Sequence, residues 1–254
     1  MRFYFYMILY FAISFSALDC IAQNKLEKAL ANPAAVTKLR IEDSPIHELP
    51  TAIGTLTELK TLYLFNNGLD SIPESIGNLQ NLETLVISSN NLKTLPASLG
   101  RLKKLKKLSL RHNLLKALPP EIGDLTELKE LYLEYNRLET LPPEIGKLKN
   151  LEFLYLNDNK LTSIPHEIGN MEHLKFLFIG KNSLTELPEE IGNLTLLTEL
   201  DVAYCGPMVR IPETIKKCKR LEFIYVDKSI LLPFTIHSVN PRLKVLIREN
   251  GVLN

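Results

Sequence analysis

One 23-residue pattern recurs along almost the whole chain, and this period constrains the fold more than any other feature. Repeats begin at Val36, Leu59, Leu82, Leu105, Leu128, Leu151, Leu174 and Leu197, and then, after 24 and 22 residues, at Leu221 and Leu243. This gives nine repeats over residues 36–242 and a closing fragment over residues 243–254. A fixed period of this length is typical of solenoids, in which each unit buries its apolar face only against its neighbours.

Within each repeat, the apolar spacing predicts a short strand followed by a turn. Counting from zero at the repeat start, Leu, Ile or Val occupies positions 3 and 5, which point to the same side of a strand. Asparagine occupies position 8 in six consecutive repeats: Asn67, Asn90, Asn113, Asn136, Asn159 and Asn182. An amide side chain can satisfy backbone groups that a turn leaves unpaired, so we expect a ladder of stacked asparagines.

The second half of each repeat predicts a short helical turn. Proline at position 14 fixes φ for this turn, and glycine at position 18 is expected to help end it. The complete pattern, LxxLxLxxNxLxxLPxxIGxLxx, resembles the leucine-rich repeat family over about residues 36–246. Its "LPxxIGxLxxL" form is similar to the Ras-group type of plant intracellular proteins, an animal Ras-pathway scaffold and many bacterial proteins. The resemblance implies a right-handed α/β horseshoe with a parallel sheet on its concave face and short helical turns on its convex face.

The first residues are typical of a secretory signal peptide over residues 1–22. Arg2 precedes an apolar run of 16 residues, which is shorter than the about 20 that a spanning helix needs. Cys20 and Ala22 form a small-x-small cleavage site, and the segment resembles those of exported bacterial proteins. Cleavage near Ala22 predicts a secreted, periplasmic or cell-envelope protein, with an uncleaved anchor and lipidation at Cys20 as alternatives. Residues 23–35 are expected to form an amphipathic helix that caps the first repeat.

The C-terminal repeats depart from the pattern. Cys205 replaces the asparagine at position 8, and Cys218 replaces the leucine at position 20. Both are expected to be free, buried thiols, with a disulfide as the alternative that export allows. In the closing fragment, a start at Leu243 places Arg248 where a core leucine belongs, which suits an edge that faces water.

Aromatic residues gather on one face of the predicted strands. The chain contains ten Phe and nine Tyr, and twelve of these residues lie after residue 16. Eleven of the twelve occupy positions 2, 4, 6 or 7, around the strand leucines. Exposed aromatic surface usually marks an interaction site, although such rings can also simply stack on a sheet. Two carboxylates are expected to edge the cluster and select a partner with Lys or Arg. The predicted binding residues are Tyr132, Tyr135, Phe153, Tyr155, Phe176, Phe178, Glu199, Asp201, Phe223 and Tyr225.

Charge and motifs argue against nucleic-acid binding and catalysis. The net charge is +1, and the basic run over residues 101–107 lies one repeat before acidic residues. Lys107 and Arg111 share repeat positions with Glu130 and Glu134, so these charges are expected to pair across neighbouring strands. The sequence has no Gly-rich phosphate loop, nucleophile elbow or Cys-pair metal spacing. We therefore expect no cofactor, no metal and no enzyme activity, and no catalytic domain appended after the repeats.

Together these features predict a non-catalytic recognition module that binds a protein or peptide on the concave sheet. A glycan ligand is one alternative, since aromatic rings can stack on sugar faces. An intracellular signalling scaffold is another, implied by the Ras-group resemblance, and it requires that the N-terminal segment not direct export. No nucleic-acid partner is expected, and no membrane contact beyond the signal peptide.

Overall fold

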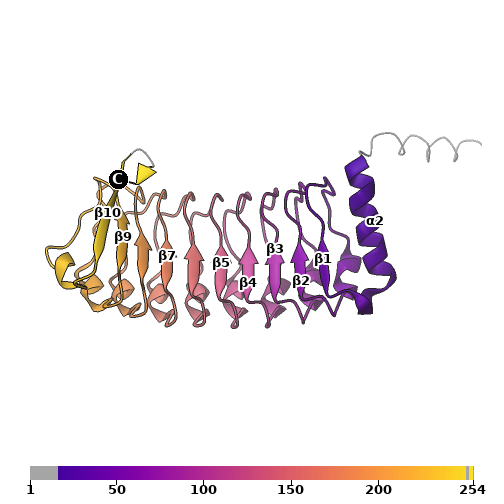
Figure 1. The fold of residues 1–254 in the computed structure, drawn as a ribbon, viewed down its shortest axis with the longest axis horizontal. Helices are drawn as coiled ribbons and strands as arrows, with labels where there is room; N and C mark the ends of the chain where they lie inside the picture. Colours follow the sequence, from indigo (N-terminus) through magenta and orange to yellow (C-terminus); the bar gives the residue numbers. More distant parts are fainter. Residues whose placement is uncertain (1–16, 250–251, 254) are drawn as a thin grey trace, which may run out of the picture.

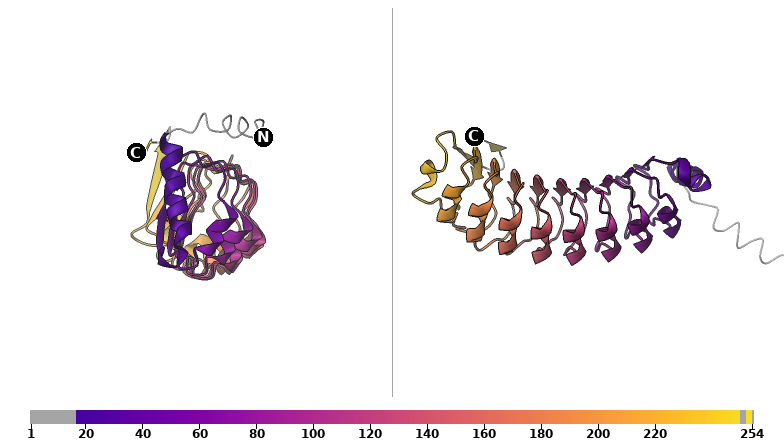
Figure 2. Two further views of the ribbon diagram at one scale, coloured as in Figure 1. Left: turned by 90° about the vertical axis from the view of Figure 1, so that its right-hand side faces the viewer. Right: turned by 90° about the horizontal axis from the view of Figure 1, so that it is seen from below.

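The computed structural model describes residues 17–249 and 252–253, and it shows an open solenoid (Figure 1). Strands β1 to β10 lie side by side in sequence order and run parallel, and β11 pairs antiparallel with β10. Figure 2 shows a shallow arc, with the sheet along its inner side and short 3-10 helices along its outer side. The α/β solenoid predicted from the repeat is therefore confirmed.

Each repeat contributes one short strand and one 3-10 helix. The strands are β1 (Lys38–Arg40), β2 (Thr61–Tyr63), β3 (Thr84–Val86), β4 (Lys107–Ser109), β5 (Glu130–Tyr132), β6 (Phe153–Tyr155), β7 (Phe176–Phe178), β8 (Glu199–Asp201), β9 (Phe223–Val226), β10 (Lys244–Glu249) and β11 (Val252–Leu253). The 3-10 helices are η1 (Pro33–Ala35), η2 (Thr51–Thr55), η3 (Glu74–Asn78), η4 (Ala97–Arg101), η5 (Pro120–Asp124), η6 (Pro143–Lys147), η7 (His166–Asn170), η8 (Glu189–Asn193), η9 (Glu213–Lys217) and η10 (Ile236–Ser238). The helices η2 to η9 each follow the position-14 proline directly.

Helix α2 (Ala17–Ala31) lies at the N-terminal end of the solenoid, beside β1 (Figure 1). Leu26 and Ala29 are buried against the first repeat, so this helix covers an edge of the core. The helix expected over residues 23–35 thus begins earlier, at Ala17, and ends earlier, before η1.

The predicted signal peptide lies mostly outside the described part of the chain, which begins at residue 17. The expected cleavage point near Ala22 falls within α2. Among the described residues, the structure contains no helix of the length and apolarity that crossing a membrane requires.

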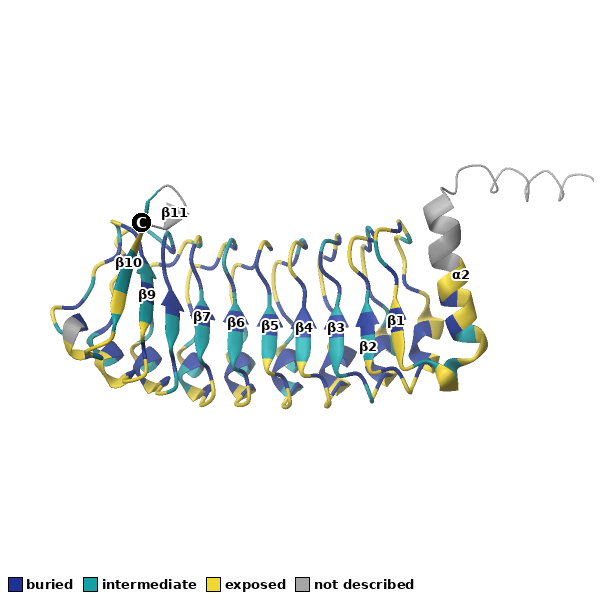
Figure 3. Cartoon of the chain, viewed as in Figure 1, coloured by how far each residue is buried: buried dark blue, intermediate teal, exposed yellow. Residues whose placement is uncertain are grey.

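The core is a continuous cluster of aliphatic side chains from the strands and the 3-10 helices. Figure 3 shows that buried residues recur in every repeat along the solenoid. In the fifth repeat, the strand residues Leu131 and Leu133 are 0% exposed, and Ile145 on η6 is also 0% exposed. Because the apolar layer of one repeat is covered by the layers on both sides, the core extends through all the repeats.

The position-8 asparagines connect neighbouring repeats through their side chains. Asn113 Oδ1 accepts a hydrogen bond from the backbone N–H of Leu92 (3.1 Å), and its Nδ2 donates to the carbonyls of Ile87 (2.9 Å) and Leu110 (3.0 Å). The same three kinds of contact recur at Asn90, Asn136, Asn159 and Asn182. Each amide therefore satisfies buried backbone groups that the turn leaves unpaired.

Cys205 interrupts this asparagine series without leaving the neighbouring turn unsatisfied. Its own backbone carbonyl accepts the hydrogen bond from Leu184 N (2.6 Å) that an asparagine side chain accepts elsewhere. Cys205 and Cys218 are both free and buried, as expected. Burial raises the pKa of each thiol to about 12, so both are inert small core residues.

Glycine at position 18 has a different role from the expected helix stop. Gly123 lies inside η5, and it is absent from the residues with positive φ. A Cβ on Gly123 would lie 2.3 Å from the carbonyl oxygen of Glu144 on η6. The glycine therefore lets neighbouring 3-10 helices pack backbone against backbone. Lys216 takes this position in η9, where the series of five-residue helices ends, and its side chain is exposed.

The last strand pairs one residue away from the predicted register. Val245 pairs with Ile224, a position-3 residue, so the final repeat begins one residue before Leu243. A shift of one residue exchanges the two faces of a strand. Arg248 therefore lies on the concave face, and the prediction that it takes a core position is wrong. Ile247 takes that position instead and is 46% exposed at the end of the solenoid.

Candidate binding surface on the concave face

Four rings at position 4 form a stack across the concave face, which we call the aromatic ladder. Tyr132, Tyr155 and Phe178 lie on β5, β6 and β7, with successive ring centroids 5.0 and 4.7 Å apart and planes within 12° of parallel. Tyr225 on β9 continues the ladder, with its centroid 6.3 Å from that of Phe178. It reaches past β8 because Asp201, at the same position there, carries no ring.

A cation lies over each end of the aromatic ladder. Lys107 Nζ is 4.8 Å from the ring centroid of Tyr132, and the guanidinium carbon of Arg248 is 5.0 Å from that of Tyr225. These distances are typical of cation–π contacts. The ring faces are thus taken by neighbouring rings and cations, and the half-buried rings present mainly their edges to solvent.

A second aromatic pair runs beside the ladder at position 2. Phe153 and Phe176 stack with centroids 4.6 Å apart and planes 3° from parallel. Glu199 follows on β8, and Phe223 continues the row on β9, where Lys244 Nζ lies 5.6 Å from its ring centroid. The predicted neighbours in this register, including Phe153 beside Phe176, are confirmed.

Most carboxylates near the ladder are already paired with a basic side chain. Lys107 Nζ lies 2.7 Å from Glu130 and Arg111 Nε lies 3.3 Å from Glu134, which confirms the expected pairing across strands. Glu199 differs, because no Lys or Arg of the described chain lies within ion-pair distance of it. It accepts a hydrogen bond of 3.4 Å from the hydroxyl of the ladder tyrosine on β9. Its half-buried carboxylate is therefore a negative charge without a basic partner.

Asp201 is not the open negative charge that the sequence suggested. Its side chain is 0% exposed and lies 3.1 Å from Arg248 Nη2. Its carboxylate also accepts hydrogen bonds from Asn157 Nδ2 (3.0 Å) and from the backbone N–H of Ala203 (3.1 Å). Burial raises the pKa of Asp201, and the charge of Arg248 and these hydrogen bonds act in the opposite direction. The prediction of an exposed acidic edge at Asp201 is corrected to a buried ion pair.

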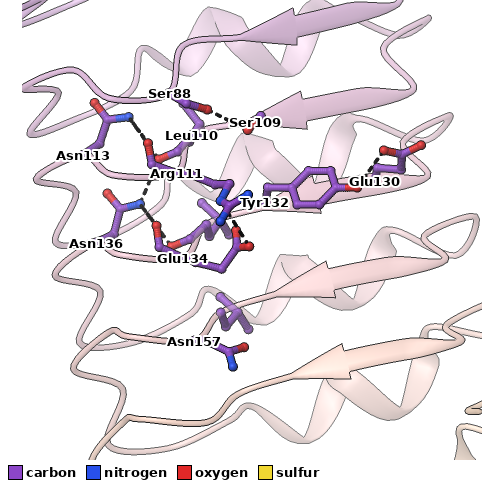
Figure 4. A network of polar contacts seen from close by, with 12 residues as sticks. Ser88, Ser109, Leu110, Arg111, Asn113, Glu130, Tyr132, Glu134, Asn136 and Asn157 are labelled. Carbon is purple, nitrogen blue, oxygen red and sulfur yellow. Dashed lines mark hydrogen bonds and ion pairs between the residues drawn. The ribbon is translucent and has the colours of Figure 1, made fainter. Parts of the chain in front are cut away.

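Glu134 occupies position 6, beside the first rung of the ladder (Figure 4). Its side chain is 8% exposed, and Arg111 lies against one carboxylate oxygen. Burial raises the pKa of Glu134, while a backbone hydrogen bond and the charge of Arg111 lower it and the charge of Asp158 raises it further. The sequence predicts only the ion pair with Arg111, and the burial of Glu134 is not evident from its repeat position.

Residues at position 7 leave the strand and lie at the margin of the surface. Tyr135 has φ 56, is 43% exposed, and stacks on His112 with centroids 4.2 Å apart. The equivalent residue has positive φ in all of the first eight repeats: Asp43, Asn66, Ser89, His112, Tyr135, Asp158, Lys181 and Tyr204. Tyr135 is therefore separate from the ladder and the phenyl pair, although the sequence grouped it with them.

Sequence reasoning missed four residues of this surface. Lys107 and Arg248 cover the ends of the ladder, and Glu134 and Asn157 lie beside it at position 6. The signal for the last two was their repeat position, which faces the same way as the rings. Arg248 was missed because the predicted register of its strand was wrong.

Comparison with known proteins agrees with this architecture. A family model described as a leucine-rich repeat region matches residues 19–113, 47–137, 97–174 and 162–246. The chain belongs to the leucine-rich repeat family. Among solved structures, this leucine-rich repeat protein is similar to one from Leptospira interrogans, with 29% identity, a TM-score of 0.61, and coverage of 89% of this chain and 75% of that one. No curated protein sequence matches it.

Two further solved structures are also similar to this leucine-rich repeat protein. The peptide hormone receptor RGFR1, solved in complex with RGF2, is 29% identical with a TM-score of 0.61, over 83% of this chain and 39% of that one. PEPR1, solved with AtPEP1, is 27% identical with a TM-score of 0.62, over 84% of this chain and 35% of that one. The chain thus spans less than half of either of these two chains. Family and neighbours together support a protein-interaction module.

Proposed function

We propose that this leucine-rich repeat protein binds a peptide or an extended protein segment along its concave face, across β5 to β9. The observation that carries the proposal is the aromatic ladder, with the phenyl pair of Phe153 and Phe176 beside it. Half-exposed aromatic edges on a rigid sheet provide apolar contact area with little loss of conformational entropy on binding. Glu199, without a basic partner, adds a point of charge selection for a Lys or Arg of the ligand.

The stacking geometry favours a polypeptide over a glycan. A sugar ring stacks on an open aromatic face, whereas the ladder faces are covered by neighbouring rings, Lys107 and Arg248. Ring edges pack well against aliphatic and aromatic side chains. The peptide hormone receptor RGFR1, solved with RGF2, supports the same class of ligand, although its chain is longer.

A test needs a ligand, and a random peptide library displayed on phage supplies one. We expect selection on the protein to enrich peptides whose affinity falls at least about tenfold when Tyr155→Ala and Phe178→Ala are combined. The control is Phe65→Ala, an exposed aromatic beyond the N-terminal end of the ladder. Circular dichroism confirms that each variant is folded. Unchanged peptide binding by the double variant would reject the concave site.

We also propose that the protein acts outside the cytoplasm, since its first 22 residues have the pattern of a signal peptide. Mass spectrometry of the protein from its native cell gives the test. A mature N-terminus at Gln23 is expected, whereas a soluble cytoplasmic chain that retains residues 1–22 would favour the intracellular scaffold.

A further inference from the structure

Glu134 carries a buried carboxylate oxygen without a donor, beside the aromatic ladder. Its Oε1 lies 3.3 Å from Arg111 Nε, but its Oε2 is buried and has no hydrogen-bond partner. A buried acceptor of this kind is unfavourable, and more so when it bears charge. The side chain, 8% exposed, thus has one satisfied oxygen and one oxygen that still requires a donor.

Asn157 provides a second acceptor in the neighbouring repeat, two residues after the end of β6. The backbone carbonyl of Asn157 accepts a hydrogen bond from Tyr135 N (3.1 Å), so the backbone at Asn157 lies next to that at Glu134 and Tyr135 in the preceding repeat. Its Nδ2 donates to Asp201 Oδ2 (3.0 Å), and this bond fixes the orientation of the amide. The Oδ1 of Asn157 is therefore the atom left free to accept, and it too is buried without a hydrogen-bond partner.

Gly180 makes this orientation possible. It occupies position 6 of the repeat between Asn157 and Asp201, where a side chain would block their contact. A Cβ on Gly180 would lie 3.2 Å from Asp201 Oδ1 and 3.4 Å from Asn157 Nδ2. Because Asp201 is held in turn by Arg248, the acceptor of Asn157 is fixed by a chain of contacts that spans four repeats.

We propose that Glu134 Oε2 and Asn157 Oδ1 form an acceptor pair for a Lys or Arg side chain of the bound peptide. The inference rests on the proposed function, because the pair adjoins the aromatic ladder. Both unpartnered atoms are acceptors, and one belongs to a carboxylate, so a cation fits the pair and an anion does not. Tyr132 and Tyr155 lie two residues earlier in the same repeats, at the ends of β5 and β6, where they can pack against the aliphatic stem of the ligand side chain.

Arg111 is the internal cation that the ligand would displace. It contacts Glu134 at 3.3 Å, and 44% of its side chain is exposed. Other charges near the pair largely offset each other. Asp158 lies 3.4 Å from Lys181, and the carboxylate that holds the amide of Asn157 is paired with Arg248 at 3.1 Å. Arg111 contacts one buried acceptor, the Oε1 of Glu134. A ligand cation that donates to both Oε2 of Glu134 and Oδ1 of Asn157 would satisfy two buried acceptors, and this difference favours the exchange.

The test uses peptides selected from the phage library on the wild-type protein. We expect the enriched peptides to share a Lys or Arg, and replacement of that residue by Met to weaken binding about tenfold. Glu134→Gln should weaken binding of the original peptide by a similar factor and leave binding of the Met-substituted peptide unchanged. The effects of the two substitutions would then be coupled. Arg111→Ser should strengthen binding of the original peptide. Glu152→Gln makes the same charge change beside Lys175 and is the matched control. It should leave the affinity of both the original and the Met-substituted peptide unchanged.

The outcomes separate the two proposals. Peptides that require the ladder but show no cation preference, or no coupling with Glu134→Gln, overturn the acceptor pair and leave the proposed function standing. Peptides that bind without the ladder, or a selection that enriches none, overturn the proposed function and the acceptor pair with it. Because Gln keeps the shape of Glu134 and removes a desolvated charge, loss of folding does not confound the variant.

Discussion

Arg248 on β10 reaches past β9 to Asp201 on β8, with 3.1 Å between its Nη2 and the carboxylate Oδ2. On the way its guanidinium covers the ring of Tyr225, and its backbone carbonyl accepts a hydrogen bond of 2.9 Å from the hydroxyl of Tyr204. One residue therefore closes the aromatic ladder, neutralises a buried carboxylate and fastens the last long strand to the repeats before it.

Arg248→Ala should destabilise the C-terminal repeats. Asp201 would keep its buried charge without a counter-charge, and we expect the free energy of unfolding to fall by about 3 kcal/mol. Urea denaturation measures the loss, and hydrogen exchange should place it at β8 to β10. Lys149→Ala is the control, because its pair with Glu172 is more than 60% exposed on both sides and is expected to contribute little to stability. Equal losses in the two variants would contradict a special role for the buried pair.

Glu134→Gln should stabilise the protein at neutral pH. Burial raises the pKa of Glu134, so the folded chain binds this proton more tightly than the unfolded chain. The stability from this group is therefore present at low pH and is lost as the pH rises through the raised pKa. The variant should melt above the wild type at pH 7, and the difference should vanish as the pH falls toward the ordinary carboxyl range.

Glu152→Gln is the opposite control for this pH dependence. Lys175 and Lys129 lower the pKa of Glu152, so its stabilisation is present above the ordinary pKa and is lost as the pH falls. This variant should melt slightly below the wild type at pH 7. A lower melting temperature for Glu134→Gln as well would mean that its pairing with Arg111 outweighs desolvation.

Gly123→Ala should destabilise the packing of the 3-10 helices. The new Cβ would lie 2.3 Å from the carbonyl oxygen of Glu144, and relief of this overlap requires a backbone shift. We expect a loss of about 1–3 kcal/mol in chemical denaturation. Lys216→Ala, at the equivalent position of η9, should change stability by less than about 0.5 kcal/mol. A tolerated alanine at position 123 would show that the helices can separate freely.

Asn113→Ala should remove the link between two repeats. It leaves the N–H of Leu92 buried without its partner and removes one of the two amide donors to the carbonyl of Ile87, so we expect a loss of about 1–3 kcal/mol. The control is Asn81→Ala, whose amide makes an exposed hydrogen bond to the carbonyl of Thr57 and should cost about 1 kcal/mol or less. Similar melting temperatures for both variants would argue against the asparagine ladder as a stabilising element.

Much of this architecture follows from the sequence because the repeat makes each residue a neighbour of its equivalent in the next repeat. A fixed period places Leu131 against Leu154 and Phe153 against Phe176 before any coordinates are known. The stacking of rings and the Lys107–Glu130 pair follow from the same rule. This rule did not hold at the C-terminal end, because the repeats there differ in length and the sequence alone did not fix the register of the last strand to within one residue.

The sequence by itself determined the solenoid, its leucine core and the face that carries the rings, because these depend on period and on the alternation of side chains along a strand. Only the tertiary structure decided that Asp201 is buried, that Asn157 spans Gly180 to reach it, and that Arg248 neutralises it. These contacts join residues two repeats apart, so they depend on side-chain reach and on which neighbours lack a side chain. The burial of a side chain depends on all the residues around it. A repeat pattern compares only equivalent positions, so it does not predict which of these polar side chains are buried.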